Sequence, residues 1–353
     1  MTASFLEESP AAAEAASQSV GEIIYTHFDS YQRDGGGKNA SRAAEALHHD
    51  ILSFVLSINS NNSNDGNEGI SQGEVSEEAA NAVKRCIDAA MGCLAASSTS
   101  KKDIWSESVT STLELGAAYA CAASKDEKIA RTVIGRTIEF LIVEKDVIRT
   151  ESCNMLGLCV RHLVESCKPA ASILKKKGKN GDAADNKSKK TNDTVAGWKL
   201  ECLLDIGKAI QPRITDKIAK VRSAAISACL HFYVSDNTTA KSAGFTTSNN
   251  KNYEKMITSI QTTLMWIMSN DSSAPNRALV AQIIGRRVSG EEKETLIPCI
   301  IERVKDVDVK VREAALDSLR ENVTMDNLTE DQRVEILRYG LTKRYVSPFC
   351  HMY

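Results

Sequence analysis

The first stretch that could carry chemistry is RDGGGKNAS, a glycine run that leads into a lysine. A phosphate-binding loop reads G-x-x-x-x-G-K-[ST], because its backbone N–H groups, its lysine and its hydroxyl surround the phosphates and Mg²⁺. Gly37 and Lys38 match this motif, but Gln32 occupies the first glycine position and Asn39 occupies the Ser/Thr position. The residues before it have a helical pattern, whereas this motif follows a strand. The sequence therefore argues against nucleotide binding.

Histidines and cysteines are the other candidate ligands and nucleophiles. His48 and His49 are adjacent on a predicted helix, so their side chains point in different directions and cannot form an i, i+4 metal pair. The chain has 10 cysteines but no C-x-x-C pair. No Ser/His/Asp or paired-carboxylate arrangement stands out, so we predict no catalytic residue, no metal site and no cofactor.

Several cysteines, among them Cys153, Cys202 and Cys229, lie within apolar helical patterns. A free thiol in such a position behaves as a small hydrophobic side chain. Reduced core cysteines are typical of cytosolic or nuclear proteins. The N-terminus resembles no secretory signal, and no apolar run approaches the ~20 residues that a membrane helix needs.

The composition favours helices. Of the 353 residues, 42% are hydrophobic and only 5% aromatic, and the formal net charge is −2. Abundant alanine supports helix, while strands prefer β-branched and aromatic residues. An all-α fold is expected.

A short sequence segment occurs twice. The two copies, ITDKIAKVRSAAISACL and VKDVDVKVREAALDSL, share the pattern D-x-x-x-K-V-R-x-A-A. Between them, NDSSAPNRALVAQII keeps the six-residue interval from aspartate to arginine. The three arginines are Arg222, Arg277 and Arg312, and EKDVIRTESCNMLGLCV around Arg149 is a weaker fourth copy. Recurrence of the same pattern at Arg222, Arg277 and Arg312, 55 and 35 residues apart, indicates a repeat array.

Each copy combines an amphipathic first helix, an Asp-bearing turn and a second helix with a small apolar face. In the first copy Val221, Ala224, Ala225, Ala228 and Cys229 follow the i, i+3, i+4, i+7, i+8 rule. A helix pair cannot cover its own apolar face, so the pairs must stack on one another. We predict a right-handed α-solenoid of HEAT-type helix pairs with long flexible insertions.

This pattern predicts a domain organisation. Residues 1–18 are expected to be a flexible N-terminus, and residues 19–341 a solenoid with flexible insertions at about 59–78, 168–195 and 235–250. The ending TKRYVSPFCHMY (342–353) lacks the expected turn and V-R-x-A helix. We interpret it as an atypical C-terminal tail, for which a truncated and a mispredicted C-terminus are the two explanations.

From about Glu139 onward the chain resembles the N-terminal HEAT region of the condensin complex subunit 3 family, the chromosome-associated protein G family. The resemblance rests on DKIAKVRSAAISACLHF, IMSNDSSAPNRALVAQII and TLIPCIIERVKDVDVKVREAALDSLRENVTMDNLTEDQRVEILRYGL. The last stretch is the most specific. The likeness covers about 200 residues and is strong over the last 140, while the lysine-rich insertion and the ending depart from the family pattern.

The resemblance implies a non-catalytic condensin subunit that binds a kleisin segment and double-stranded DNA during mitotic chromosome condensation. The ATP chemistry would belong to the SMC subunits. It also implies residence in the nucleus and on chromosomes, with a cytoplasmic pool.

In HEAT stacks a recurring arginine typically meets the aspartate of an adjacent turn. We therefore expect a structural ladder of Arg222, Arg277 and Arg312 with Asp216, Asp271 and Asp306, since a guanidinium fork suits a carboxylate. Basic residues without an obvious partner are the better candidates for phosphate contacts. These candidates are Lys217, Lys220, Arg286, Arg287, Arg303, Lys305, Lys310 and Arg320.

The alternative for each of these residues is an ordinary solvated surface charge. A lysine-rich segment could also act as an electrostatic arm for DNA, as a nuclear import signal or merely as a soluble insertion. Its lysines include Lys175, Lys176, Lys177, Lys179, Lys187, Lys189 and Lys190. The competing function for the whole chain is a HEAT-repeat scaffold or adaptor that binds proteins and not DNA.

Overall fold

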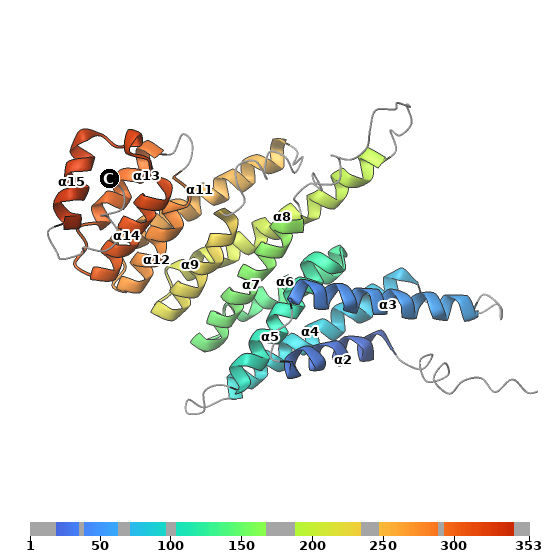
Figure 1. The fold of residues 1–353 in the computed structure, drawn as a ribbon. Helices are drawn as coiled ribbons and strands as arrows, with labels where there is room; N and C mark the ends of the chain where they lie inside the picture. The colour runs from blue at the N-terminus through green and yellow to red at the C-terminus, as the bar shows by residue number, and fades with distance from the viewer. Residues whose placement is uncertain are drawn as a thin grey trace, which may run out of the picture. The chain divides into compact units, whose positions relative to one another are not determined.

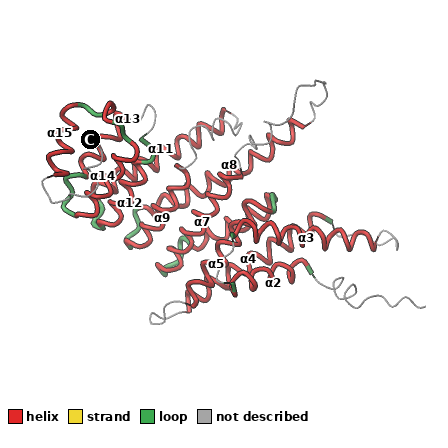
Figure 2. Tube along the Cα trace, viewed as in Figure 1, coloured by secondary structure: helices red, strands yellow, loops and turns green. Residues whose placement is uncertain are grey.

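The computed structural model describes residues 19–34, 39–62, 71–96, 104–166, 188–233, 247–288 and 293–341. Most of these residues are helical, short loops join the helices, and no strand occurs among them (Figures 1 and 2). The prediction of an all-α helical-repeat fold is therefore confirmed. Two compact units, Met1–Ser166 (unit 1) and Cys167–Tyr353 (unit 2), divide the chain, where a single solenoid was expected.

Unit 1 packs around helix α4. Its helices are α2 (Val20–Arg33), α3 (Ala40–Asn62), α4 (Gln72–Ala96), α5 (Ile104–Ala118), α6 (Glu127–Phe140) and α7 (Asp146–Ser166). Helix α4 contacts α2, α5 and α6, and α7 packs against both α5 and α6. Large side chains such as Ile87, Met91 and Leu156 are completely buried between them.

Helix α5 continues directly into a π-helical turn, Tyr119–Ala123. This turn packs against α3 and α7 and buries Tyr119 and Cys121. Soon after it, Lys125 has a φ of 52°, the left-handed conformation, which reverses the chain before Asp126 caps α6. Neither feature has a signature in the amino-acid pattern.

The described residues of unit 2 form three helix pairs and one further helix. The pairs are α8 (Ser188–Ile214) with α9 (Ala219–Tyr233), α11 (Thr247–Asn270) with α12 (Ala274–Gly285), and α13 (Lys293–Arg303) with α14 (Val309–Asn322). A short 3₁₀ turn, Met325–Asn327, leads to α15 (Glu330–Leu341).

First helices stack on first helices and second helices on second helices. Helix α11 contacts α8 and α13, and α13 contacts α15; in the other layer α12 lies between α9 and α14. Figure 1 shows this lateral succession from the yellow to the red part of unit 2. Each pair therefore covers the apolar face of its neighbour, as a repeat array requires.

The second helices approach closely because their facing residues are small. Val221, Ala225 and Cys229 are fully buried in α9. In α12, a Cβ atom built on Gly285 would lie 2.5 Å from Cβ of Ser318 in α14, so only glycine fits there. The hydroxyl of Ser318 donates to the Ala281 carbonyl across the same contact, at 3.0 Å.

Several helices extend into the predicted insertions. Helix α3 reaches Asn62 and α4 begins at Gln72, so residues 59–62 and 72–78 are helical. A reciprocal cap starts α4, in which Ser71 and Glu74 each receive the other's backbone N–H. Helices α8 and α11 likewise begin inside the predicted second and third insertions, because Lys, Ser, Asn and Thr can continue a helix that is anchored further along.

Candidate nucleic-acid interface

Each turn between the two helices of a unit 2 pair is built on an aspartate. The carboxylates of Asp216, Asp271 and Asp306 accept the backbone N–H two residues further on, at 3.0, 2.7 and 2.9 Å. This Asx arrangement shapes the turn and prepares the start of the second helix. The repeated aspartate is therefore a local folding element as well as a charge.

The repeated arginine joins consecutive turns. Nε and Nη2 of Arg222 donate to both carboxylate oxygens of Asp271, each at 2.7 Å, and Nη1 donates to the Asp216 carbonyl at 2.8 Å. Arg277 repeats this arrangement with Asp306, at 2.9 and 2.8 Å, and with the Asp271 carbonyl at 2.7 Å. Each guanidinium thus closes its own turn and holds the aspartate of the following turn. We call this arginine–aspartate pair a rung.

The rungs are well shielded from solvent. The side chain of Asp271 is 1% exposed and that of Arg222 is 11% exposed. Burial alone would raise the pKa of Asp271, but the hydrogen bonds from Arg222, from the Ser273 N–H and from Asn276 outweigh it and lower the pKa. The pKa of Asp306 is lowered in the same way, chiefly by Arg277 acting against burial.

Arg149 and Arg312 also form the bonds that close their own turns. Nη1 of Arg149 donates to the Val143 carbonyl at 2.8 Å and also to Glu144, so the weaker fourth copy in unit 1 closes its turn in the same manner. A valine, however, stands where unit 2 has the turn aspartate. Nη1 of Arg312 donates to the carbonyls of Asp306 and Val307, at 2.7 and 3.0 Å.

Three of the predicted DNA contacts lie on the edge of unit 2 that carries the turns. Lys217, Lys220 and Lys310 are exposed there. Among the described residues no carboxylate lies within ion-pair distance of these three ammonium groups. Lys220 and Lys310 share the same offset, but Pro275 holds that position in α12, which lies between their helices. Lys220 and Lys310 therefore form no continuous basic row, because two helix spacings, roughly 16–20 Å, separate them.

Arg286 and Arg287 lie at the opposite edge. Helix α12 is 12 residues long, so its two ends are separated by about 18 Å. Arg286 follows the end of α12 and is exposed, and Arg287 is half-buried. These candidates therefore form two separate groups, one at each edge of unit 2.

Three candidates have carboxylate partners, which corrects the prediction that they are unpaired. Lys305 binds Glu302 at 3.1 Å and Glu335 of α15, and Arg320 binds Asp317 at 3.0 Å. Arg303 donates to the Met268 carbonyl and approaches Asp306 at 3.8 Å. Residues three apart meet on a helix surface, and Glu335 comes from the neighbouring helix. Each of these cations therefore has a carboxylate within 4 Å.

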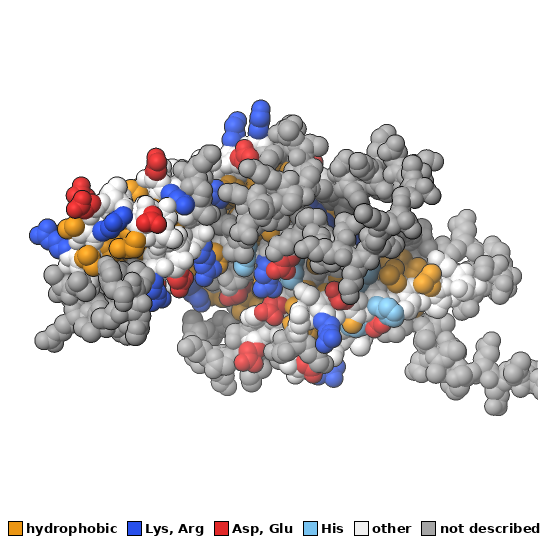
Figure 3. All heavy atoms as spheres, turned by 45° about the horizontal axis from the view of Figure 1, so that its top comes forward, with side chains coloured by type: hydrophobic (Ala, Val, Ile, Leu, Met, Phe, Trp, Pro, Cys, Tyr) orange, Lys and Arg blue, Asp and Glu red, His pale blue; other side chains and the backbone are white. Residues whose placement is uncertain are grey.

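On the face drawn in Figure 3, the Lys and Arg side chains of the described residues are interspersed with Asp and Glu and form no single basic patch. The lysines of the predicted basic arm from Lys175 to Lys187 lie outside the described residues. Lys189 and Lys190 fall in the first turn of α8, where only the backbone is described.

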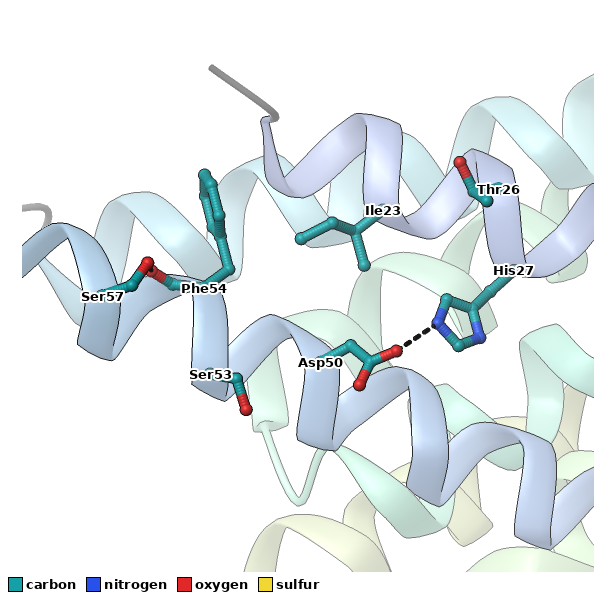
Figure 4. Close-up of a pocket in the computed structure, with 7 residues that line it drawn as sticks. All are labelled: Ile23, Thr26, His27, Asp50, Ser53, Phe54 and Ser57. Carbon is teal, nitrogen blue, oxygen red and sulfur yellow. Dashed lines mark hydrogen bonds and ion pairs between the residues drawn. The ribbon is translucent and has the colours of Figure 1, made fainter. Parts of the chain in front are cut away.

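Unit 1 holds an open cavity of about 470 Å³ between α2 and α3 (Figure 4). His27 Nε2 and a carboxylate oxygen of Asp50 lie 2.9 Å apart across the two helices. The hydroxyls of Ser53 and Ser57 point away from the imidazole ring, so the cavity contains no serine–histidine pair for nucleophilic catalysis. Its lining residues are Ile23, Thr26, His27, Asp50, Ser53, Phe54 and Ser57.

The thiols and metal-ligand residues fit a structural role. Cys153, Cys202 and Cys229 are buried thiols in the helical core, as predicted. Burial raises the pKa of the Cys86 thiol to about 11, which disfavours the reactive thiolate. Within the described ranges no three His, Cys, Asp or Glu side chains are grouped closely enough to hold a metal ion. No helix in those ranges is both long and apolar enough to cross a bilayer.

Two contributors to the site have no clear signal in the sequence. Asn276 is 1% exposed and links the rungs, donating to the Ala219 carbonyl at 3.2 Å and to Asp271 at 3.3 Å. Glu335 reaches Lys305 from a helix that begins 25 residues further along the chain. Only the stacking of helices brings such partners together.

Comparisons with known proteins give little further information. No family model matches the chain, and no curated protein matches it. Among solved structures, a crystal structure of an engineered protein is similar at 11% identity and a TM-score of 0.30, over 94% of this chain and 81% of the other.

Proposed function

We propose that this chain is a non-catalytic helical-repeat subunit of a condensin complex, which binds the kleisin subunit and holds double-stranded DNA without reading its sequence. The proposal rests on the sequence of residues 295–341, which resembles that of the condensin subunit 3 family. The earlier segment DKIAKVRSAAISACLHF shares this resemblance. Nuclear and chromosomal localisation with a cytoplasmic pool, and association with SMC subunits, belong to the same proposal.

The geometry of unit 2 supports a role in binding an extended partner more than a role in catalysis. The family-like segments form α9, α12, α13, α14 and α15, which belong to one stack of repeats. Buried rungs link consecutive turns, so exposed side chains along the turn edge keep a regular spacing. A rigid array with fixed spacing suits the binding of an extended partner.

The cations without a carboxylate partner at the turn edge are the proposed phosphate contacts. Lys217 lies in a turn, and Lys220 and Lys310 lie at the starts of α9 and α14. All three side chains are exposed to solvent. Lysine binds phosphate as a point charge and carries no base information, so such binding is independent of sequence. Arg286 at the opposite edge is a second, separate group.

Duplex binding at several salt concentrations tests this proposal. We expect the triple variant K217E/K220E/K310E to weaken binding of a 30-base-pair duplex by roughly tenfold or more. Its salt slope should fall by about 0.9 for each phosphate that the protein no longer neutralises. The substitution R286E should have a smaller effect, because it changes a single cation.

A matched control changes the same amount of charge elsewhere. Lys208, Lys251 and Lys255 are also exposed and lie on first helices, away from the turn edge. K208E/K251E/K255E should lower affinity only through net charge, by about the same factor for every duplex. Equal losses in the two triple variants would contradict a turn-edge DNA site, and no binding at low salt would contradict DNA holding altogether.

A protein scaffold without DNA binding is the second candidate. It is favoured by the neutralised cations Arg303, Lys305 and Arg320, which leave less free positive charge than the sequence suggests. Titration of purified kleisin separates the cases. Kleisin binding with no salt-dependent DNA binding supports a scaffold, and binding of both supports the condensin proposal.

A further inference from the structure

The cavity between α2 and α3 has an apolar end and a charged end. On α2, Ile23 precedes His27 by four residues, and on α3, Phe54 follows Asp50 by four residues. Four residues span about one helical turn, so the two ends are about 6 Å apart. Figure 4 shows the two apolar side chains toward one end of the cavity and the imidazole–carboxylate pair at the other.

The apolar end offers a wall without charge. Ile23 is buried and Phe54 is half-buried, so part of the aromatic ring stays open to the cavity. Residues 51–62 of α3 contain no charged side chain. The hydroxyls of Thr26 and Ser57 donate to carbonyls of their own helices, at 2.8 and 2.7 Å. This end therefore suits an apolar group.

The charged end is a carboxylate with accepting capacity left. Nε2 of His27 and Nδ1 of His49 lie 2.9 and 3.4 Å from the two oxygens of Asp50. Among the described residues no lysine or arginine lies within ion-pair distance of this carboxylate. An ionised carboxylate has about four lone-pair sites, so it can accept further hydrogen bonds.

The carboxylate of Asp50 is ionised at neutral pH. Burial alone would raise its pKa, but the hydrogen bonds from His27 and His49 outweigh burial and lower the pKa. The side chain is 54% exposed, so a ligand can reach it from solvent.

The two helices together favour a cation. They carry four carboxylates and two guanidinium groups, and one of these guanidinium groups is already paired within α2. A surplus of negative charge raises the local concentration of cations and disfavours anions. The carboxylates are Glu22, Asp29, Glu45 and Asp50, and the guanidinium groups are Arg33 and Arg42.

We propose that this cavity binds a small organic ammonium ion, whose apolar body lies between Ile23 and Phe54 and whose ammonium group donates to Asp50. The cavity volume of about 470 Å³ falls within the range of roughly 300–1,000 Å³ that is typical of ligand pockets. An apolar anion would place its charge beside the carboxylate, and an ammonium group without an apolar body would leave the wall unused. This binding site lies in unit 1 and does not depend on the role proposed for unit 2.

Phenethylamine is a suitable probe, because its ring and its ammonium group are separated by two carbons and match the two ends of the cavity. We would titrate the full chain, labelled with ¹³C at the isoleucine δ1 methyl groups, and follow Ile23. A saturable shift is expected with phenethylamine. Phenethyl alcohol should bind roughly two- to fivefold more weakly, as expected for the loss of a solvent-exposed ion pair. Hydrocinnamate, the matching anion, should bind more weakly still.

Three variants assign the two ends. Asp50→Asn keeps an acceptor for His27 but removes the charge, so it should weaken phenethylamine to the affinity of the alcohol and leave the alcohol unchanged. Phe54→Ala removes the apolar wall and should weaken both ligands by roughly threefold or more. The matched control is Leu56→Ala, since Leu56 is 66% exposed on the same helix and does not line the cavity. It should change neither affinity.

Two results would overturn the proposal. The first is a shift of the Ile23 methyl that does not saturate, or equal affinities for the amine and the anion, and this comparison needs no variant. The second is an equal loss of amine and alcohol binding in Asp50→Asn, because Asp50 would then support the helix pair and not the ligand. Retained alcohol binding in that variant shows that the cavity persists, so a selective loss of the amine reports the ion pair.

Discussion

Unit 1 and unit 2 use different polar contacts between helices. In unit 2, buried arginine forks join aspartates in successive turns, with carboxylate side chains 1% and 4% exposed. In unit 1, the pairs that cross between helices are more exposed, such as Arg136 with Asp88 at 31% and 33%. The comparison shows that the repeated aspartate–arginine interval indicates a buried ion pair between successive helix pairs. A helical periodicity of apolar residues alone indicates only that the helices pack.

The sharpest test of this difference is Asp271→Ala in unit 2. This change leaves the Arg222 charge buried without its partner and also removes the Asx bond to Ser273. We expect unit 2 to lose about 3–5 kcal/mol of stability. Hydrogen exchange resolved by helix is the suitable measurement, because a chain with two units has no single free energy of unfolding.

The contradicting outcome is a loss below about 1 kcal/mol, which would make the rungs ordinary surface pairs. Restoring polarity without charge, in Asp271→Asn, should recover only part of the stability. A loss spread equally over unit 1 and unit 2 would contradict a role confined to the ladder.

Two glycines extend the comparison to packing. A Cβ on Gly285 in unit 2 would lie 2.5 Å from Ser318, whereas a Cβ on Gly116 in unit 1 would meet Met155 at an ordinary 3.5 Å. Gly285→Ala should therefore destabilise unit 2 by about 1–3 kcal/mol through overpacking. Gly116→Ala should be neutral or stabilise unit 1 by up to about 1 kcal/mol, because alanine is the better helix former.

Thermal unfolding of the two alanine variants checks this pair. We expect a lower unfolding temperature for Gly285→Ala and an unchanged or higher one for Gly116→Ala. A stable Gly285→Ala protein would mean that α12 and α14 can separate without cost, and that the close approach is not part of the array's stability.

Much of unit 2 could be predicted from the sequence because its determinants are local. The interval from Asp306 to Arg312 repeats that from Asp271 to Arg277, and both the turn and the second helix follow from it. The distribution of free charge could not be predicted in the same way. Lys305 looked unpaired because Glu335 lies on another helix, and only the stacking brings the two together.

Unit 1 offered weaker signals. The π-helical turn at Tyr119 and the left-handed Lys125 depend on how α5 packs against α3 and α7. No residue pattern announces either of them. Arg149 was identified only because it keeps the arginine of the repeat, although Val143 replaces the aspartate.

Acid should weaken the unit 2 ladder. The pKa values of Asp271 and Asp306 are lowered in the folded state, because their arginine bonds outweigh burial. Their contribution is fully present above the unfolded aspartate pKa of about 3.9, and it is lost as the pH falls through the lower folded values. We would measure the urea concentration at half-unfolding of unit 2 between pH 7 and pH 2.5. This midpoint should decrease once the pH is below about 4.

The double variant D271N/D306N provides the control for this titration. Its unit 2 midpoint should be lower at pH 7 and should change less below pH 4, since no ladder carboxylate remains to be protonated. In unit 1, Asp50 also has a lowered pKa, where hydrogen bonds from His27 and His49 outweigh burial. An unchanged pH slope in the double variant would assign the acid sensitivity to such groups instead.

The smallest expected effect is that of Asp88→Ala in unit 1. Arg136 donates to Asp88 at 2.7 Å, but it also binds Glu139 at 2.6 Å and lies over the ring of Phe140. Because the guanidinium is partly solvated and keeps two other contacts, the loss should be about 0.2–1 kcal/mol. Hydrogen exchange of α4 and α6 measures it under the same conditions as Asp271→Ala. A loss of stability as large as that of Asp271→Ala would contradict a special role for the aspartate–arginine interval. An aspartate outside any rung would then contribute as much stability as one within a rung.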